Sequence, residues 1–230
     1  MNTADLTRVR HSIADNAMAA NSPAYQEVVS RCVAAARGWP LGPGARVLDA
    51  GAGTGDISIP LALELPQCTV IHLEPDSEMC DAARTKAAQA GVTNLEFLQC
   101  DLASANFLPG SMSAIVSVHR LYAAADPRKA IRVLADWLAP GGRLFAWDAG
   151  GRAHVSDWAR YILAETRRRQ GWLAALKVLW SGRVQNAGKS WLHDSAGFRA
   201  GFEGAGLMIE DSCDGNRACG NLVVCRKPDV

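Results

Sequence analysis

A glycine-rich turn between a strand-like run and a helix-like run is the strongest chemical signal in this sequence. The stretch reads Val47-Leu48-Asp49-Ala50-Gly51-Ala52-Gly53-Thr54-Gly55-Asp56. Gly51 and Gly53 allow the backbone to turn sharply and to approach a ligand with no Cβ in the way, while the following helix presents unpaired N–H groups. Because a strand precedes the turn and a helix follows it, the stretch predicts an anionic or zwitterionic ligand rather than an ordinary tight turn.

Two more acidic residues end predicted strands. Glu74 ends the second strand, 23 residues after Gly51, where a carboxylate can accept hydrogen bonds from both ribose hydroxyls of a nucleoside. Asp101 ends the third strand, where it can accept from an adenine amino group while the Leu102 N–H meets a ring nitrogen. Taken singly, either carboxylate is more often a strand-end or helix-capping residue. Together with the glycine turn they predict one binding rim at the carboxyl ends of a sheet.

The elements that must position this rim alternate between strands and helices from Ala45 to about Asp148. Near-continuous apolar runs predict strands at Arg46–Leu48, Thr69–Leu73, Leu95–Gln99, Ala114–Val118 and Arg143–Trp147. Helical patterns between them cover Asp56–Glu64, Ser77–Ala90 and Pro127–Trp137, the last ending at Pro140-Gly141-Gly142. This alternation predicts right-handed crossovers and a parallel sheet.

The chain divides into four parts on the same evidence. Residues 1–44 predict helices that cover the site, with a break at Pro23, and residues 45–150 form the sheet core. Residues 151–194 hold four of the seven tryptophans and eight Lys/Arg against three Asp/Glu, which is typical of an inserted helical cap. Residues 195–230 add a helix at Ser195–Ala205 and closing strands at Leu207–Glu210 and Asn221–Cys225.

Composition narrows the class of protein. The chain has 230 residues, 49% hydrophobic content and a formal net charge of +1, which disfavours disorder and a broad nucleic-acid-binding face. Its seven cysteines form no CxxC pair, so we expect reduced thiols, no metal and a cytoplasmic protein. With no apolar run of about 18 residues, no membrane contact is expected, and the chain is expected to be a monomer or homodimer.

The separated motifs resemble those of the class I S-adenosylmethionine-dependent methyltransferases. The resemblance rests on Asp49–Gly55, on Glu74-Pro75-Asp76-Ser77-Glu78-Met79, on Asp101 and on Leu138-Ala139-Pro140-Gly141-Gly142. It implies an α/β fold with a Rossmann-like, doubly wound, seven-stranded sheet, mostly parallel with an antiparallel last strand, plus the helical cap. It also implies S-adenosyl-L-methionine as cofactor. The residues it assigns to the cofactor are Asp49, Ala50, Gly51, Gly53, Gly55, Glu74, Pro75, Met79, Asp101, Leu102 and Ser117.

The end of the fourth strand bears on the methyl acceptor. It reads Ile115-Val116-Ser117-Val118-His119-Arg120 and lacks the Asn/Asp-Pro-Pro-Tyr motif of family members that act on nucleic-acid or glutamine amines. This departure favours the small-molecule, natural-product or quinone-type branch, with an apolar or aromatic acceptor. His119 is expected to remove a proton as the catalytic residue, although a pocket-wall histidine fits the same position. The residues expected to contact the acceptor are Tyr25, His119, Tyr122, Trp158, Tyr161, Trp172, Trp191 and His193, with His154 a weaker candidate.

The sequence leaves two other classes of protein open. An NAD(P)-binding oxidoreductase requires G-x-G-x-x-G, but position 56 is Asp and the third glycine is at 55, although Glu74 also suits the ribose of that cofactor. A methyltransferase-like binding module without catalysis is the second alternative. Intact cofactor motifs count against it.

Overall fold

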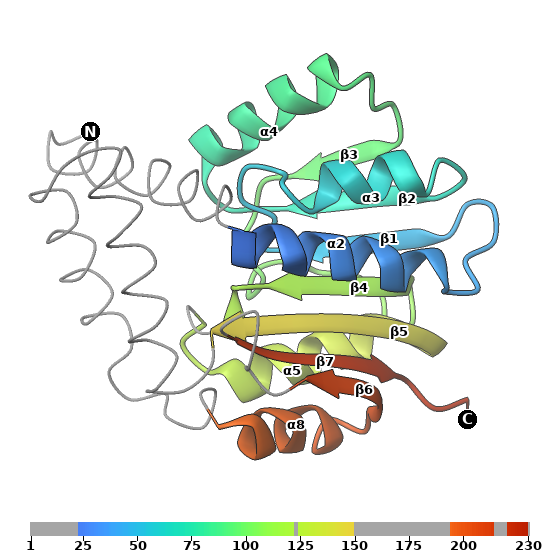
Figure 1. Cartoon of the computed structure of the whole chain (residues 1–230), viewed down its shortest axis with the longest axis vertical. Coiled ribbons are helices and arrows are strands. Elements are labelled where there is room, and N and C mark those ends of the chain that lie inside the picture. Colours follow the sequence, from blue (N-terminus) through green and yellow to red (C-terminus); the bar gives the residue numbers. More distant parts are fainter. Residues whose placement is uncertain (1–22, 122–123, 150–193, 214–219, 230) are drawn as a thin grey trace, which may run out of the picture.

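A computed structural model describes residues 23–121, 124–149, 194–213 and 220–229. The strands are β1 (Arg46–Ala50), β2 (Thr69–Leu73), β3 (Leu95–Leu98), β4 (Met112–Val118), β5 (Leu138–Ala149), β6 (Met208–Cys213) and β7 (Gly220–Arg226). The helices are α2 (Pro23–Arg37), α3 (Ser58–Glu64), α4 (Ser77–Gln89), α5 (Pro127–Trp137) and α8 (Ser195–Glu203). The elements alternate as the sequence predicts, and α2 begins at the predicted break, Pro23 (Figure 1).

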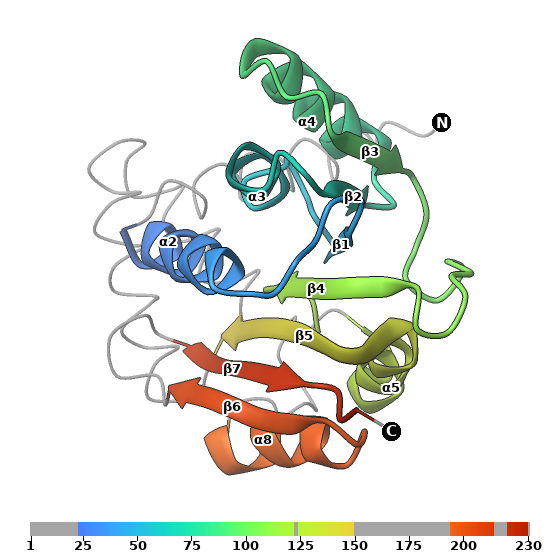
Figure 2. The same cartoon turned by 90° about the vertical axis from the view of Figure 1, so that its right-hand side faces the viewer.

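The strands form one seven-stranded sheet in the order β3-β2-β1-β4-β5-β7-β6. Neighbours from β3 to β5 are parallel, whereas β7 runs antiparallel to both β5 and β6. Figure 2 shows the arrowheads of β4, β5 and β6 pointing one way and that of β7 the other. The predicted sheet with its antiparallel last strand is therefore confirmed.

Most strand bounds lie within one to three residues of the prediction, and the largest difference is at the start of β5. The turn expected at Pro140-Gly141-Gly142 lies inside β5, which begins at Leu138 rather than Arg143. The register against β4 shifts between Met112 and Ala114, and Gly141 has a φ of 71°. The strand therefore absorbs the glycine pair as a bulge, which continues the pairing that a turn would end.

Aspartates fix the starts of the later helices. The side chains of Asp76 and Asp126 each accept a hydrogen bond of 3.0 Å from the backbone N–H three residues on, at the starts of α4 and α5. Asp194 does the same for α8 at 2.9 Å. Such caps satisfy N–H groups that a helix leaves unpaired, so these three boundaries follow from local chemistry.

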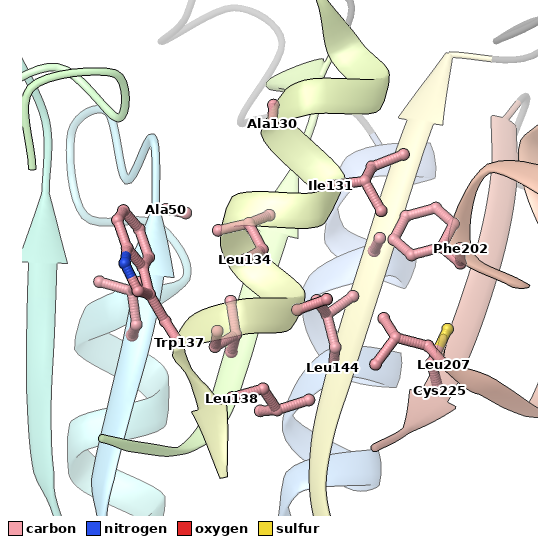
Figure 3. Packing of buried hydrophobic residues seen from close by; sticks show 14 of the residues in the cluster. Ala50, Ala130, Ile131, Leu134, Trp137, Leu138, Leu144, Phe202, Leu207 and Cys225 are labelled. Carbon is pink, nitrogen blue, oxygen red and sulfur yellow. The ribbon is translucent and has the colours of Figure 1, made fainter. Parts of the chain in front are cut away.

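Apolar layers cover both faces of the sheet. On one face α2 and α3 pack over Val47, Val70 and Val116. On the other, α5 and α8 pack over Leu48, Ile115 and further alternate strand residues. Figure 3 shows Ala130, Ile131, Leu134 and Trp137 of α5 in this second layer, with Phe202 of α8 beside them. The fully buried strands leave their carboxyl ends as the place for polar side chains.

The strand order places a switch point next to the glycine turn. β1 pairs with β2 on one side and with β4 on the other, so the connections leave β1 and β4 in opposite directions across the sheet. In parallel α/β sheets ligands bind at such a point, outside the carboxyl ends of the strands. The ends of β1, β2, β4 and β5 are therefore where a site is expected.

Candidate functional site

Asp49 is a buried carboxylate at the carboxyl end of β1. Only 1% of its surface is exposed, and its Oδ2 has no hydrogen-bond partner among the described residues. The pKa of Asp49 is raised to about 7, chiefly by burial; the nearby carboxylates of Glu74 and Asp56 contribute to the rise, whereas Ser58 opposes it. A buried, incompletely paired carboxylate is costly to keep, which is typical of a ligand-binding group.

Glu74, at the end of β2, joins two loops of the site. Its Oε2 accepts a 3.0 Å hydrogen bond from the Gly53 N–H, and its Oε1 accepts one of the same length from the Asp76 N–H. The side chain is 4% exposed. Each carboxylate oxygen has a second lone pair, so Glu74 can hold the glycine turn and still accept from a ligand.

The glycine turn uses left-handed backbone at each predicted glycine. Gly51, Gly53 and Gly55 have φ values of 80°, 56° and 83°. A Cβ on Gly55 would lie 3.1 Å from the Cβ of Ala83 on α4, so that glycine lets the turn pack closely. The backbone of Gly51 faces the carboxyl end of β4.

Arg120 crosses the rim and was not singled out by the sequence. A Cβ built on Gly51 would lie 2.4 Å from the Arg120 Cγ, so the side chain takes the space that the missing Cβ leaves. Its guanidinium nitrogen lies 3.9 Å from the Asp101 Oδ2. Arg120 thus spans the rim from the glycine turn to the third strand, and a ligand that approaches Gly51 must displace it.

Asp101 has a local structural role as well. It is exposed and accepts a 2.9 Å hydrogen bond from the Ala103 N–H, as in an Asx turn. The neighbouring Leu102 packs against the apolar layer under α5. The prediction that Asp101 ends the third strand is wrong by a short turn: β3 ends at Leu98, and both predicted positions lie in the turn that follows it, with the Asp101 carboxylate open to solvent.

Tyr25 places α2 at the same rim. Burial raises the pKa of its phenol above the usual range, and the nearby carboxylates of Asp49 and Asp56 raise it further. The sequence predicts Tyr25 as an acceptor contact, while the structure brings it near the carboxylate assigned to the cofactor.

His119 follows β4 in an unusual backbone conformation. Its φ of 55° makes it the one non-glycine residue with positive φ in the described part of the chain. The His119 N–H donates to the Trp147 carbonyl at 2.8 Å, and the two rings lie 5.6 Å apart. Burial lowers the pKa of the imidazole to about 4, although 29% of the side chain remains exposed. The ring is therefore neutral at neutral pH.

Asp148 is a polar neighbour of His119 that the sequence analysis missed. Its Oδ1 lies 3.7 Å from the His119 Nδ1, and its side chain is fully buried. On the neighbouring strand β7, the residue opposite Asp148 is the buried Asn221. Ser117, which is 1% exposed, lies near the end of β4. Asp148 ends its apolar strand as Asp49 and Glu74 end theirs, and this pattern is the signal that would have found it.

Lys86 on α4 is a second missed residue. Its Nζ donates to the Thr54 Oγ1 at 3.0 Å and to the Asp56 Oδ1 at 2.9 Å, while Thr54 donates to the Asp56 Oδ2 at 2.6 Å. This network fastens the glycine turn from outside. The lysine lies 32 residues from Thr54 along the chain, so sequence spacing gives no signal for it.

Some of the other predicted site residues lie beside the rim, and the rest lie outside the described residues. Ala50 and Met79 are buried and Pro75 is half-buried near the start of α4, beside the rim. The remaining predicted acceptor contacts, with the cap, lie outside the described residues: Tyr122, His154, Trp158, Tyr161, Trp172, Trp191 and His193.

A cavity of about 290 Å³ lies elsewhere in the fold. Its walls include Trp39, Leu41, Ser113 and Arg143, at the amino ends of β4 and β5. The Arg143 guanidinium is already paired with Glu210 at 2.9 Å. This cavity is at the opposite edge of the sheet from the carboxylates, so the rim is the better candidate site.

Among the described residues, no group of three or more His, Cys, Asp and Glu side chains is arranged to hold a metal ion. No helix in the same part of the chain combines the length and apolar character that a membrane crossing requires.

Comparisons with known proteins agree with this geometry. The signature of a methyltransferase domain matches residues 47–142. A highly reducing polyketide synthase of Emericella nidulans is 30% identical over 178 residues, which is 74% of this chain and 6% of that protein. The ubiquinone biosynthesis O-methyltransferase of Xanthomonas campestris pv. campestris is 39% identical over 105 residues, 45% of this chain and 42% of that protein. The chain thus spans less than half the length of either relative.

A solved structure shares the fold. The magnesium protoporphyrin IX methyltransferase of Synechocystis PCC 6803 superposes with a TM-score of 0.62 at 18% identity, covering 89% of this chain and 80% of that one. The sheet order, the glycine turn and the matched domain define a Rossmann-like methyltransferase core. Residues 47–142 therefore form a methyltransferase domain of the class I S-adenosylmethionine-dependent type, and S-adenosylmethionine is the cofactor of that family.

The chemistry of the rim suits this cofactor. The Asp49 Oδ2, buried and without a partner among the described residues, can accept from the ammonium of a methionine moiety. Glu74 has lone pairs for ribose hydroxyls, and Gly51 allows close backbone approach once Arg120 moves. The donor set therefore fits a ligand with a cationic end and a nucleoside end.

Proposed function

We propose that this chain transfers a methyl group from S-adenosylmethionine to an oxygen, nitrogen or carbon atom of a small apolar or aromatic metabolite by in-line displacement. The observation that carries the proposal is the buried Asp49 carboxylate beside a glycine turn at the switch point of the sheet. The matched methyltransferase domain supports the reaction, and the O-methyltransferase named for ubiquinone biosynthesis supports the substrate class.

The first task of the rim is to bind the cofactor. When bound, S-adenosylmethionine supplies a methyl group on a positively charged sulfur. Asp49 binds the cofactor's ammonium, Glu74 accepts from its ribose hydroxyls, and Asp101 with the Leu102 N–H contacts its adenine. Holding two reactants in line lowers a barrier by as much as about 7–11 kcal/mol, so the placement of these groups supplies most of the catalysis.

The second task is to orient the acceptor. His119 lies at the end of β4 with a neutral ring, so it can accept the proton of an acceptor hydroxyl or hydrogen-bond to it. As the ring becomes charged, the Asp148 carboxylate 3.7 Å away stabilises the imidazolium. The lowered pKa favours orientation of the acceptor over removal of a strongly held proton.

The substrate class rests on two features of the sequence. The end of β4 lacks the Asn/Asp-Pro-Pro-Tyr motif, which disfavours nucleic-acid and glutamine amines. The segment 151–194 supplies four tryptophans, whose rings give large apolar contact area, and we propose it as a cap over the acceptor. Tyr25 would close the same chamber from α2.

Calorimetry with the full chain tests the cofactor assignment. S-adenosylhomocysteine carries the same ammonium and nucleoside as the cofactor, so the wild-type chain should bind it and ignore NAD. The variant Asp49→Asn should weaken that binding at least about tenfold, because it removes a charge-assisted hydrogen bond. Tight NAD binding, or an Asp49→Asn variant that binds as the wild type does, would contradict the proposal.

A further inference from the structure

The first half of the glycine turn is fixed against the sheet by hydrogen bonds from its backbone. The N–H groups of Gly51 and Ala52 both donate to the Leu73 carbonyl on β2, at 2.9 and 3.0 Å. The next N–H along the turn, that of Gly53, donates to the Glu74 carboxylate at 3.0 Å. All of these bonds run to the end of β2, so they hold the turn from its inner side.

The second half of the turn, residues 54–56, is held from its outer side by α4. The Lys86 Nζ donates to the Thr54 Oγ1 at 3.0 Å and to the Asp56 Oδ1 at 2.9 Å. The Thr54 hydroxyl donates to the Asp56 Oδ2 at 2.6 Å, which closes a triangle of three hydrogen bonds. Thr54 is only 4% exposed, so water has little access to the hydroxyl that Lys86 contacts.

One face of α4 carries the residues that meet this turn. Met79, Ala83 and Lys86 are separated by four and three residues, a spacing that places side chains on one side of a helix. Met79 and Ala83 are buried, and Ala83 is the residue against which Gly55 packs. Since Met79 is expected to contact the cofactor, the same helix face joins the turn to a second predicted part of the site.

A glycine turn depends on such fastening more than an ordinary loop does. Its three glycines have positive φ, and a glycine leaves that conformation for others at little steric cost. A turn that samples many conformations must be ordered when a ligand binds, and this ordering weakens the affinity. A contact that holds the turn in place beforehand therefore strengthens binding of the part of the ligand that touches it.

We propose that Lys86 is a positioning residue for the cofactor: its ammonium holds the second half of the glycine turn on α4, in the conformation that receives the methionine end of S-adenosylmethionine. This inference rests on the proposed function, which places that end at Asp49 and the turn. An isolated pair of exposed charges contributes little, and the Lys86 side chain is 45% exposed. The effect therefore depends on the hydrogen bond to the buried Thr54 as well as on the Asp56 charge.

Calorimetry with two ligands tests where Lys86 acts. S-adenosylhomocysteine has an amino-acid end and a nucleoside end, whereas 5′-methylthioadenosine keeps the nucleoside and lacks the amino acid. Lys86→Met keeps most of the apolar stem but loses the charge and the donors. It should weaken binding of S-adenosylhomocysteine about fivefold and that of methylthioadenosine less than about twofold. A residue that only stabilises the fold would weaken both ligands alike.

Two further variants complete this comparison. Lys86→Arg keeps the charge and can donate to both oxygens, so it should bind S-adenosylhomocysteine within about twofold of the wild type. Lys129→Met removes an exposed lysine from α5 and is the matched control, which should change neither affinity.

Thr54→Val tests the path through the buried hydroxyl. It keeps the branched shape but removes the acceptor that Lys86 contacts, so it should weaken binding of S-adenosylhomocysteine by a factor similar to that of Lys86→Met. Because both changes break the same network, the double variant should bind less than about twofold more weakly than either single variant. Fully multiplied effects in the double variant would overturn the path through Thr54.

Amide hydrogen exchange tests the fastening without any ligand. The Gly55 N–H donates to the Ala52 carbonyl at 3.0 Å within the turn. In cofactor-free Lys86→Met this N–H should exchange several-fold faster than in the wild type, while the amide of Leu48 in β1 should not change. An unchanged rate at Gly55 would overturn the inference.

The outcomes separate this inference from the proposed function. Wild-type binding of S-adenosylhomocysteine, together with equal weakening of both ligands or of neither in Lys86→Met, overturns the positioning role and leaves the proposed function standing. A wild-type chain that does not bind S-adenosylhomocysteine overturns both.

Discussion

Glu74 offers a sharp perturbation because its two oxygens hold two loops at once. Each oxygen accepts a backbone N–H at 3.0 Å, one from Gly53 and one from Asp76. In Glu74→Gln the side chain keeps its shape but has one acceptor and one donor. One of the two backbone N–H groups must then face an amide NH₂, so the substitution breaks one bond while preserving the packing.

The size of the effect follows from the charge of the acceptor. A hydrogen bond to a charged group contributes about 1.5–3 kcal/mol, so the free energy of unfolding should fall by about that amount. The variant also loses one charged acceptor for the ribose, and S-adenosylhomocysteine should bind roughly 10- to 150-fold more weakly.

Urea unfolding of the cofactor-free chain and calorimetry give the two numbers independently. Glu96→Gln, an exposed residue on β3, is the matched control and should change neither. A Glu74→Gln chain that unfolds and binds as the wild type does would refute the role of Glu74 in both the loop and the ribose site. A lower free energy of unfolding with unchanged binding of S-adenosylhomocysteine would mean that Glu74 holds the loops but does not bind the ribose.

Further predictions concern single residues of the rim and His72, which is buried on β2 opposite Asp49. His119→Asn should bind cofactor normally but lose turnover by about 10²-fold for a hydroxyl acceptor, and a loss below about tenfold at every pH would make His119 a pocket wall. Asp49→Asn should raise the free energy of unfolding at pH 8 by about 1–3 kcal/mol while binding is lost, because it removes a buried, underpaired charge; equal stability would contradict this. Arg120→Ala should bind S-adenosylhomocysteine several-fold more tightly, since nothing then covers Gly51, and weaker binding would make Arg120 a cofactor ligand. The pKa of buried His72, about 4, lies below its value of about 6.5 in the unfolded chain, so stability should fall as the pH drops from about 6.5 to about 4. His72→Phe should remove that part of the slope in urea unfolding, and an unchanged slope would contradict the assignment.

Most of the sheet could be predicted because its signals are local. Apolar runs ending in Asp49 and Glu74 mark buried parallel strands, and the aspartates at 76, 126 and 194 mark helix starts. The boundary at Leu138 could not be predicted in the same way. A Pro-Gly-Gly sequence is typical of a turn, and only pairing with β4 and the backbone of Lys227 draws it into the strand.

The site was predicted in part for the same reason. The glycine turn and its acidic neighbours are local motifs, and Asp148 carries the same local signal at the end of an apolar run. The contacts that Arg120, Lys86 and Asp148 make, in contrast, join segments far apart in the chain. Positive φ at His119 and the burial of Asp148 depend on how β4, β5 and β7 pair. Such contacts are set by tertiary structure, and a single sequence carries no spacing rule for them.

Transfer of a labelled methyl group tests the central claim most directly. The wild-type chain would be incubated with S-adenosylmethionine labelled in its methyl group and with a mixture of small phenols, quinols, carboxylic acids and amines, and the products separated by mass spectrometry. We expect label in one or more of these small acceptors, reduced at least about tenfold in Glu74→Ala and Asp49→Asn. In parallel incubations with protein or nucleic acid as acceptor, label in those polymers and none in the small acceptors would contradict the proposed function.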